Sequence, residues 1–155
     1  MAYTFALRPS KAAMFSWDTP APFMLPLTAQ GADIDGLGHT NNTVYVQWCE
    51  QVAWAHSHRL GLGIDDYRRL DRAMAIRSAS YDYLLPTFEG ERLTLGTWLA
   101  GGDGRLSMRR HFQLVRDDDG ATVMRGHWDL VCIELGSGKP KRMPAEFVAA
   151  YVQPK

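Results

Sequence analysis

The stretch DIDGLGHTNNTVYVQW, Asp33–Trp48, changes character partway along its length. Its first ten residues hold two aspartates, a histidine and two asparagines, and the residues that follow are largely apolar. The side chain of Asn41, Asn42 or Thr43 can accept a hydrogen bond from a first-turn N–H group, so these residues predict the start of a helix. The apolar residues beyond them predict that this helix is buried.

The segment after this start has the pattern of one long helix. NTVYVQWCEQVAWAHSHRLGLG runs for about 18 residues without a helix breaker, and Val44, Trp48 and Val52 recur at helical spacing. Gly61 or Gly63 can end the helix. A helix with apolar residues over much of its circumference needs other elements to wrap around it.

The rest of the chain supplies strands for that purpose. Candidate strands after the helix are AMAIRSASYDYLL, RLTLGTWLAG, RLSMRRHFQLVR and ATVMRGHWDLVCIE, and FMLPLTA precedes the polar stretch. Turn signals at 86–91, 101–104 and 117–120 separate them, and such short connections favour antiparallel hairpins. We therefore expect an α+β domain in the order strand, long helix, then four strands.

Length and composition limit the other possibilities. The 155 residues fit one domain, which we place at 23–155 after an N-terminal extension at 1–22. Asp18 and nearby prolines interrupt the apolar run of that extension before a signal peptide or membrane span could form. The 17 basic and 17 acidic residues balance, so we expect neither a nucleic-acid nor a membrane partner.

The cysteines and histidines favour a protein without a metal site. Cys49 and Cys132 lie far apart in apolar segments, which indicates reduced core thiols and a cytoplasmic protein. Cys49 could be a nucleophile, but no neighbouring group in the sequence marks it as activated. His56 and His58 are two residues apart, and such positions on a helix do not face each other, so we expect no metal there.

The polar stretch also has what acyl transfer requires. Helix N-terminal N–H groups stabilise a carbonyl oxygen that gains negative charge, and Gly36 and Gly38 let the backbone approach a ligand. Asp35 could activate water or attack the carbonyl carbon directly. A turn followed by a helix cap explains the same residues without any chemistry. The residues alone leave both interpretations open.

Three separated segments resemble the hotdog-fold acyl thioesterases, the 4-hydroxybenzoyl-CoA thioesterase-like superfamily. DIDGLGHTNNTVYVQWCE resembles their Asp-x-Asp, glycine turn and His-x-Asn-Asn pattern, YLLPTFEGERLTL from Tyr83 their Tyr-Leu-x-Pro strand and turn, and GKPKRMPAEF from Gly138 their closing segment. The resemblance covers roughly residues 23–150. The matching positions in the first segment are Asp33, Asp35, His39, Asn41, Asn42, Tyr45 and Glu50.

This resemblance implies a long central helix wrapped by a curved antiparallel sheet of five or six strands. It also implies that two subunits pair their sheets and build the active sites at their interface, as a homodimer or as a tetramer of paired dimers. Asp35 matches the catalytic carboxylate, and Asn42 matches the helix-start amide that polarises the thioester carbonyl. His39 resembles the histidine of plant acyl-ACP thioesterases, although Leu37 replaces the asparagine of their constellation.

The implied reaction is hydrolysis of an acyl-CoA or acyl-carrier-protein thioester, with Asp35 as base or nucleophile and no cofactor besides the thioester substrate. His39 and Asn42 would orient the carboxylate or bind the carbonyl oxygen. Further candidates for substrate binding are Asn41, Thr43, Tyr45, Glu50, Arg109, Arg110, Lys141 and Arg142. The four basic residues among them would bind the CoA phosphates at the mouth of the pocket. An enoyl-CoA hydratase or dehydratase and a non-catalytic acyl-CoA sensor are the alternatives.

Overall fold

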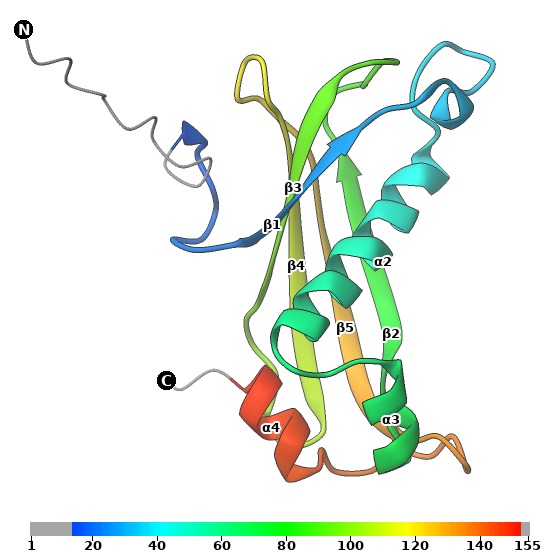
Figure 1. Cartoon of the computed structure of the whole chain (residues 1–155), viewed down its shortest axis with the longest axis vertical. Helices are drawn as coiled ribbons and strands as arrows, with labels where there is room; N and C mark the ends of the chain where they lie inside the picture. The colour runs from blue at the N-terminus through cyan, green and yellow to red at the C-terminus, as the bar shows by residue number, and fades with distance from the viewer. Residues whose placement is uncertain (1–13, 153–155) are drawn as a thin grey trace, which may run out of the picture.

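The computed structural model describes residues 14–152, and its centre is helix α2, Asn42–Arg59, which packs across a five-stranded antiparallel sheet (Figure 1). The strand order across the sheet is β1-β3-β4-β5-β2. The strands are β1 Phe23–Thr28, β2 Arg72–Tyr83, β3 Arg92–Leu99, β4 Ser107–Arg116 and β5 Thr122–Glu134. The predicted α+β class, the element order and the long helix are confirmed.

Three short helices in the described part of the chain were not predicted. They are η1 Gly31–Asp33, α3 Ile64–Leu70 and α4 Ala145–Tyr151. At seven residues or fewer, each is too short for a helical repeat of apolar residues to stand out from the neighbouring segments. Both α3 and α4 lie near the end of α2 in space, where they close one end of the core (Figure 1).

One face of α2 forms the core with the sheet. Val44, Tyr45, Trp48, Cys49 and Val52 are buried on this face. Burying each large apolar side chain stabilises the fold by about 1.5–3 kcal/mol, so this face fixes the helix on the sheet. The two cysteines are free and fully buried, as predicted, and burial raises the pKa of the Cys49 thiol. Cys49 is therefore a poor nucleophile.

Residues 14–22, the described part of the predicted extension, pack on the face of the sheet turned away from α2. The Trp17 ring lies over Gly96, where an added Cβ would come within 2.6 Å of the ring. The buried side chain of Gln113 accepts a hydrogen bond from the Asp18 N–H (2.8 Å) and donates to the Ser16 carbonyl (2.9 Å). These bonds tie the segment to the middle of the sheet.

Strand β2 is an edge of the sheet. It pairs with β5 along one side, and no strand of residues 14–152 pairs with its other side. Its register shifts between Ile76 and Ser78, and residues 76–80 are exposed. A long exposed edge of this kind offers unpaired backbone groups to another strand.

Candidate active site

Asp35 lies in a tight turn between η1 and α2. Its N–H donates to the His39 carbonyl (2.8 Å), and its carbonyl accepts from the Gly38 N–H (3.0 Å). Gly38 has a φ of +82°, a conformation that glycine adopts without strain. One carboxylate oxygen of Asp35 accepts from the Leu37 N–H (2.8 Å), and the other accepts no hydrogen bond from residues 14–152. The turn therefore holds the carboxylate and leaves one oxygen available.

Asp33 has a structural role. Its carboxylate accepts a hydrogen bond from the Gln30 N–H (2.8 Å) and so caps η1. Its carbonyl accepts from the Asn41 N–H (2.8 Å), which connects η1 to the start of α2. Each of the two aspartates of the motif thus has one carboxylate oxygen held by a backbone N–H, and Asp35 is the one in the turn that leads into α2.

Asn41 is the N-cap of α2, as one of the predicted alternatives has it. Its side-chain oxygen accepts from the Thr43 N–H (2.9 Å) and from the Thr43 hydroxyl (2.8 Å), and its carbonyl accepts from the Val44 N–H (2.9 Å). The N–H of Asn42 donates to no group in the described part of the chain. One donor of the first turn, at the predicted position, is therefore open to a ligand oxygen.

A pocket of about 160 Å³ opens beside this helix start. It is lined by His39, Thr40, Asn42, Tyr45, Tyr83, Leu84, Leu85 and Pro86. The His39 ring also packs edge-on against Phe88, with ring centroids 5.3 Å apart. His39 and Asn42 thus share one pocket. Asp35 does not line it but is joined to His39 through its backbone N–H. No hydrogen bond joins the side chains of these three residues to one another.

A buried hydroxyl chain anchors the turn to the segment before β3. The Tyr45 hydroxyl lies 2.7 Å from the Thr87 hydroxyl, which donates to the Thr40 hydroxyl (2.7 Å). The Thr40 N–H donates to the Thr87 carbonyl (2.9 Å). Tyr45, a predicted substrate-binding residue, therefore lines the pocket while its hydroxyl supports the site. Sequence reasoning missed Thr87, because nothing near it in the sequence indicates this contact.

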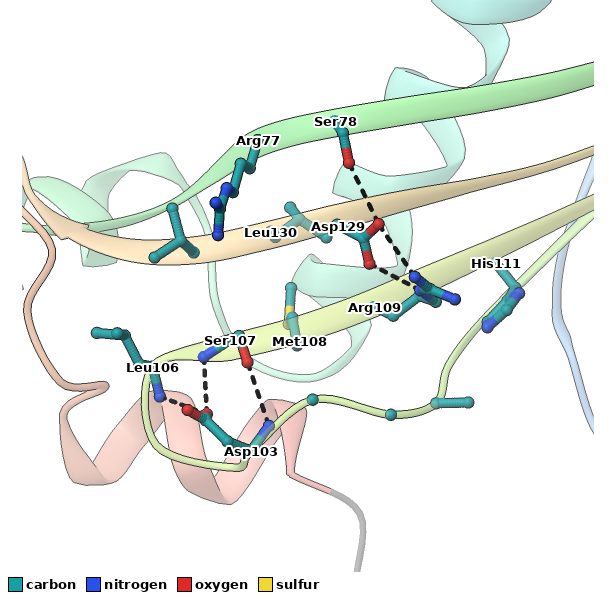
Figure 2. Close-up of a pocket in the computed structure, with 14 residues that line it drawn as sticks. Arg77, Ser78, Asp103, Leu106, Ser107, Met108, Arg109, His111, Asp129 and Leu130 are labelled. Carbon is teal, nitrogen blue, oxygen red and sulfur yellow. Dashed lines mark hydrogen bonds and ion pairs between the residues drawn. The ribbon is translucent and has the colours of Figure 1, made fainter.

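The predicted CoA-binding arginines on β4 lie on opposite faces of the sheet. Arg109 points away from α2 and forms two hydrogen bonds with Asp129 (2.7 and 3.1 Å), at a pocket of about 990 Å³ (Figure 2). Arg110 points toward α2 and is 2% exposed. Successive strand residues face opposite sides, so only one of the pair can lie at the surface. The surface position expected for Arg110 is corrected to a buried one.

The other basic candidates lie between β5 and α4, a segment at the far end of the molecule from the start of α2 (Figure 1). Lys141 forms an ion pair with Glu134, and the carbonyl of the exposed Arg142 accepts a hydrogen bond from Arg72 (3.3 Å). Glu50 is exposed on α2 and lines a third pocket, which it shares with Arg110. Within one protomer these residues are therefore not gathered around Asp35.

No group of three or more His, Cys, Asp and Glu residues within residues 14–152 is arranged to hold a metal ion. His56 lies against Arg110, and the His58 ring lies next to Gly63. In the same described range, no helix is long and apolar enough to cross a bilayer.

Comparison with known proteins places this fold in a family. The model of the thioesterase-like superfamily matches residues 30–151. A 1,4-dihydroxy-2-naphthoyl-CoA thioesterase from Synechocystis superposes with a TM-score of 0.77 at 20% identity, over 84% of this chain and 96% of that one. A DHNA-CoA thioesterase from Staphylococcus aureus superposes with a TM-score of 0.70 at 21% identity, over 77% and 78% of the two chains.

A third structure, a Staphylococcus aureus protein in complex with CoA, has a TM-score of 0.76 at 16% identity, over 82% of this chain and 79% of that one. No curated protein matches the chain significantly. The family match covers most of the chain, including the Asp35 turn, α2 and the whole of β2–β5. The chain therefore belongs to the thioesterase-like superfamily, and the predictions of a hotdog fold and of a thioester hydrolase are confirmed.

Proposed function

We propose that the protein hydrolyses acyl-CoA thioesters at the start of α2, with Asp35 as the catalytic carboxylate. One observation carries this proposal: within eight consecutive residues, the turn before α2 and the first position of the helix present a carboxylate oxygen of Asp35 and the N–H of Asn42, neither of which has a partner within residues 14–152. A general base and an oxyanion donor are the two groups that hydrolysis of a thioester requires. The named activities of the structural neighbours support CoA thioesters as the substrate class.

In this mechanism the thioester carbonyl oxygen accepts a hydrogen bond from the Asn42 N–H, and the helix dipole stabilises the negative charge that develops there. Asp35 removes a proton from water, and the resulting hydroxide adds to the carbonyl carbon. The carbon–sulfur bond then breaks, and the thiolate takes the proton from Asp35. If Asp35 instead attacks directly, water hydrolyses the mixed anhydride to the same products. His39, on the pocket wall, orients the thioester or the water.

We propose further that two protomers pair through their β2 edges. The unpaired side of β2 and the exposed residues 76–80 support this arrangement, because they leave a long row of backbone groups available for another strand. Pairing of this kind is isologous and would extend the sheet across the dimer. Association of two such dimers into a tetramer is compatible with the same edge pairing.

For the CoA phosphates we propose the basic residues that remain at the surface, Arg109, Lys141 and Arg142. Arg77 joins them, because it is exposed and lines the same large pocket as Arg109 (Figure 2). Asp129 already neutralises Arg109, so Arg77 contributes the more available positive charge.

The test is thiol release from a panel of short, medium, long and aromatic acyl-CoAs, with enoyl-CoAs followed by their absorbance in parallel. We expect release of free CoA from saturated members of the panel. Loss of enoyl absorbance without thiol release would identify a hydratase instead. Calorimetric binding without any turnover would identify a sensor, and both outcomes would overturn the proposed hydrolysis.

A further inference from the structure

The second half of α2 covers a buried positive charge that the proposed reaction does not use. Arg110 extends from β4 beneath the helix and is 2% exposed. One terminal nitrogen of its guanidinium donates to Nδ1 of His56 (2.9 Å) and to the hydroxyl of Thr97 (3.2 Å). Its Nε and its other terminal nitrogen donate to no group within residues 14–152.

His56 does not balance this charge. Arginine can only donate, so Nδ1 of His56 accepts the hydrogen bond and the ring is neutral. Burial and the Arg110 charge lower the pKa of His56 to about 4, which agrees with a neutral ring. Burial lowers the pKa of Arg110 to about 10, so it is still a cation at neutral pH.

No carboxylate in the described part of the chain forms an ion pair with Arg110. A buried cation without a counter-ion is costly, because desolvation of the charge is not offset by an attractive partner. Proteins tolerate such a group where a ligand supplies the opposite charge.

A pocket of about 90 Å³ lies against Arg110. It is lined by Glu50, Ala53, Trp54, Ser57, Tyr67, Met74, Ile76, Met108, Arg110, Trp128 and Leu130. Its walls are mainly apolar and aromatic. It is smaller than the roughly 300–1,000 Å³ that encloses a complete ligand, so it takes one end of a larger molecule.

The other polar groups of the inner wall bond to one another. The Tyr67 hydroxyl lies 2.7 Å from the Tyr151 hydroxyl, and the Tyr151 hydroxyl donates to the Ser57 hydroxyl (2.9 Å). Glu50, by contrast, is exposed at the mouth of the pocket. The unused N–H groups of Arg110 are therefore the donors that an entering group would meet deep inside.

We propose that this pocket binds the distal carboxylate of the acyl group, so that the enzyme prefers CoA monothioesters of dicarboxylic acids. The proposal rests on the proposed function, since it names the substrate class of that same thioesterase site. The apolar walls hold the methylene or aryl part of the acyl group, and the planar guanidinium of Arg110 hydrogen-bonds the carboxylate.

The distance along α2 between the Asp35 turn and Arg110 indicates that the two residues acting on one substrate come from different protomers. Asn42 and His56 are 14 positions apart, about 21 Å at 1.5 Å per residue. A five-carbon acyl chain spans only about 5 Å, so Asp35 and Arg110 of the same protomer cannot act on one molecule. Antiparallel pairing of two β2 edges also makes the two α2 helices antiparallel, and brings the start of one toward the second half of the other. Arg110 thus serves the Asp35 of the other copy.

The first experiment compares matched acyl-CoA pairs that differ only in the distal charge: glutaryl against valeryl, adipyl against hexanoyl, and 4-carboxybenzoyl against 4-methylbenzoyl. We expect a higher kcat/KM for the charged member of at least one pair. Arg110→Met, which keeps an unbranched apolar stem but has no charge, should lower that ratio about 100-fold. Arg110→Lys keeps the charge without the planar fork and should give an intermediate ratio.

Arg125→Met is the control, because Arg125 lies on the opposite face of the sheet and pairs with Asp18 (2.6 Å). It should leave the ratio unchanged. Thermal melting of each variant separates a folding defect from a change in selectivity. Preference for the neutral member in every pair, or an unchanged ratio in a folded Arg110→Met variant, would overturn the proposal while thiol release still supports the thioesterase.

If no member of the panel releases thiol, the proposed function fails, and the pocket is then tested by binding alone. Isothermal calorimetry with glutaryl-CoA and valeryl-CoA should still show tighter binding of the charged ligand to wild type and loss of that difference in Arg110→Met. Equal affinities in wild type would overturn the carboxylate site itself.

A second experiment tests the sharing of the site between copies. D35N and R110M chains with different tags are co-expressed, and the mixed dimer is purified. One of its two sites then combines Asp35 of one chain with Arg110 of the other, so about half of the wild-type turnover of glutaryl-CoA should return. A mixed dimer no more active on glutaryl-CoA than its R110M parent would overturn the shared site, because each chain would then use only its own Asp35 and its own residue 110.

Discussion

The start of α2 draws its polar side chains from ten consecutive residues, whereas the pocket under its second half draws them from distant segments. Asp35, His39 and Asn42 follow one another along the chain, and backbone hydrogen bonds over a few residues hold them in place. Arg110 comes from β4, and its hydrogen-bond partners come from α2 and β3.

This difference determines how much stability the protein loses when one contact is removed at each site. At the helix start the cap and turn hydrogen bonds are local, apart from the buried hydroxyl chain through Thr87, so removing one of the local bonds costs little and leaves the rest of the turn intact. Under the second half of the helix, polar groups are buried among apolar side chains, and a lost partner cannot be replaced by water.

The largest effect is expected at Asp35. We predict that Asp35→Asn lowers kcat by about 10³-fold, because an amide can neither remove a proton from water nor attack the thioester. Asp33→Asn is the matched control, since an amide oxygen can still accept the hydrogen bond from Gln30 that caps η1. Steady-state thiol release measures both, and circular dichroism confirms the fold. Equal losses of kcat in the two variants would mean that both aspartates only stabilise the turn and that Asp35 has no catalytic role.

Thr87 should show the next largest effect, on stability. Thr87→Val leaves the buried hydroxyls of Thr40 and Tyr45 without their common partner, which should lower the free energy of unfolding by about 2 kcal/mol. Tyr45→Phe is the comparison, because it removes one hydroxyl and preserves the bond between Thr87 and Thr40. Urea denaturation measures both changes. A smaller loss in Thr87→Val than in Tyr45→Phe would contradict the central position of Thr87.

The sequence predicted the start of α2 well and the pocket at Arg110 poorly, for a physical reason. The Asp35 turn, the cap at Asn41 and the 18 residues of α2 follow from local rules of spacing and hydrogen bonding. The burial of Arg110 depends on which residue of β4 faces the helix, and the neighbouring Arg109 and Arg110 have the same chemistry. Only the register of the folded sheet distinguishes them.

The same limit applies to the partners of Arg110. His56 and Thr97 lie in α2 and β3, far from Arg110 in the sequence, and no motif connects them. The short helices α3 and α4, which supply Tyr67 and Tyr151, have too few residues to give a clear periodic pattern. Tertiary contacts of this kind become visible only when the chain is folded.

A smaller effect is expected at the cap of α2. Asn41→Ala should lower the free energy of unfolding by about 1 kcal/mol, because the Thr43 N–H loses its acceptor. Asn41→Ser retains a capping oxygen and should restore most of that stability, as chemical denaturation can show. An increase in KM in Asn41→Ser, with stability preserved, would assign Asn41 to substrate binding in addition to capping.

The last effect is a pH dependence at the other end of the helix. Because the pKa of His56 is lowered to about 4 in the folded protein, the unfolded chain takes up its proton first as the pH falls from about 6.5. The contribution of His56 to the free energy of unfolding is thus complete above pH 6.5 and is lost progressively as the pH falls toward 4. His56→Gln cannot titrate, although its amide oxygen can still accept from Arg110.

The variant should therefore show a smaller fall in melting temperature between pH 7 and pH 5 than wild type. His111, whose pKa is also lowered by burial, titrates in both proteins, so its contribution cancels in the comparison. Identical pH profiles would mean that His56 takes up its proton as readily in the folded protein as in the unfolded chain. A protonated ring could not accept the hydrogen bond from Arg110, so that result would also contradict the arrangement that leaves Arg110 as an uncompensated charge.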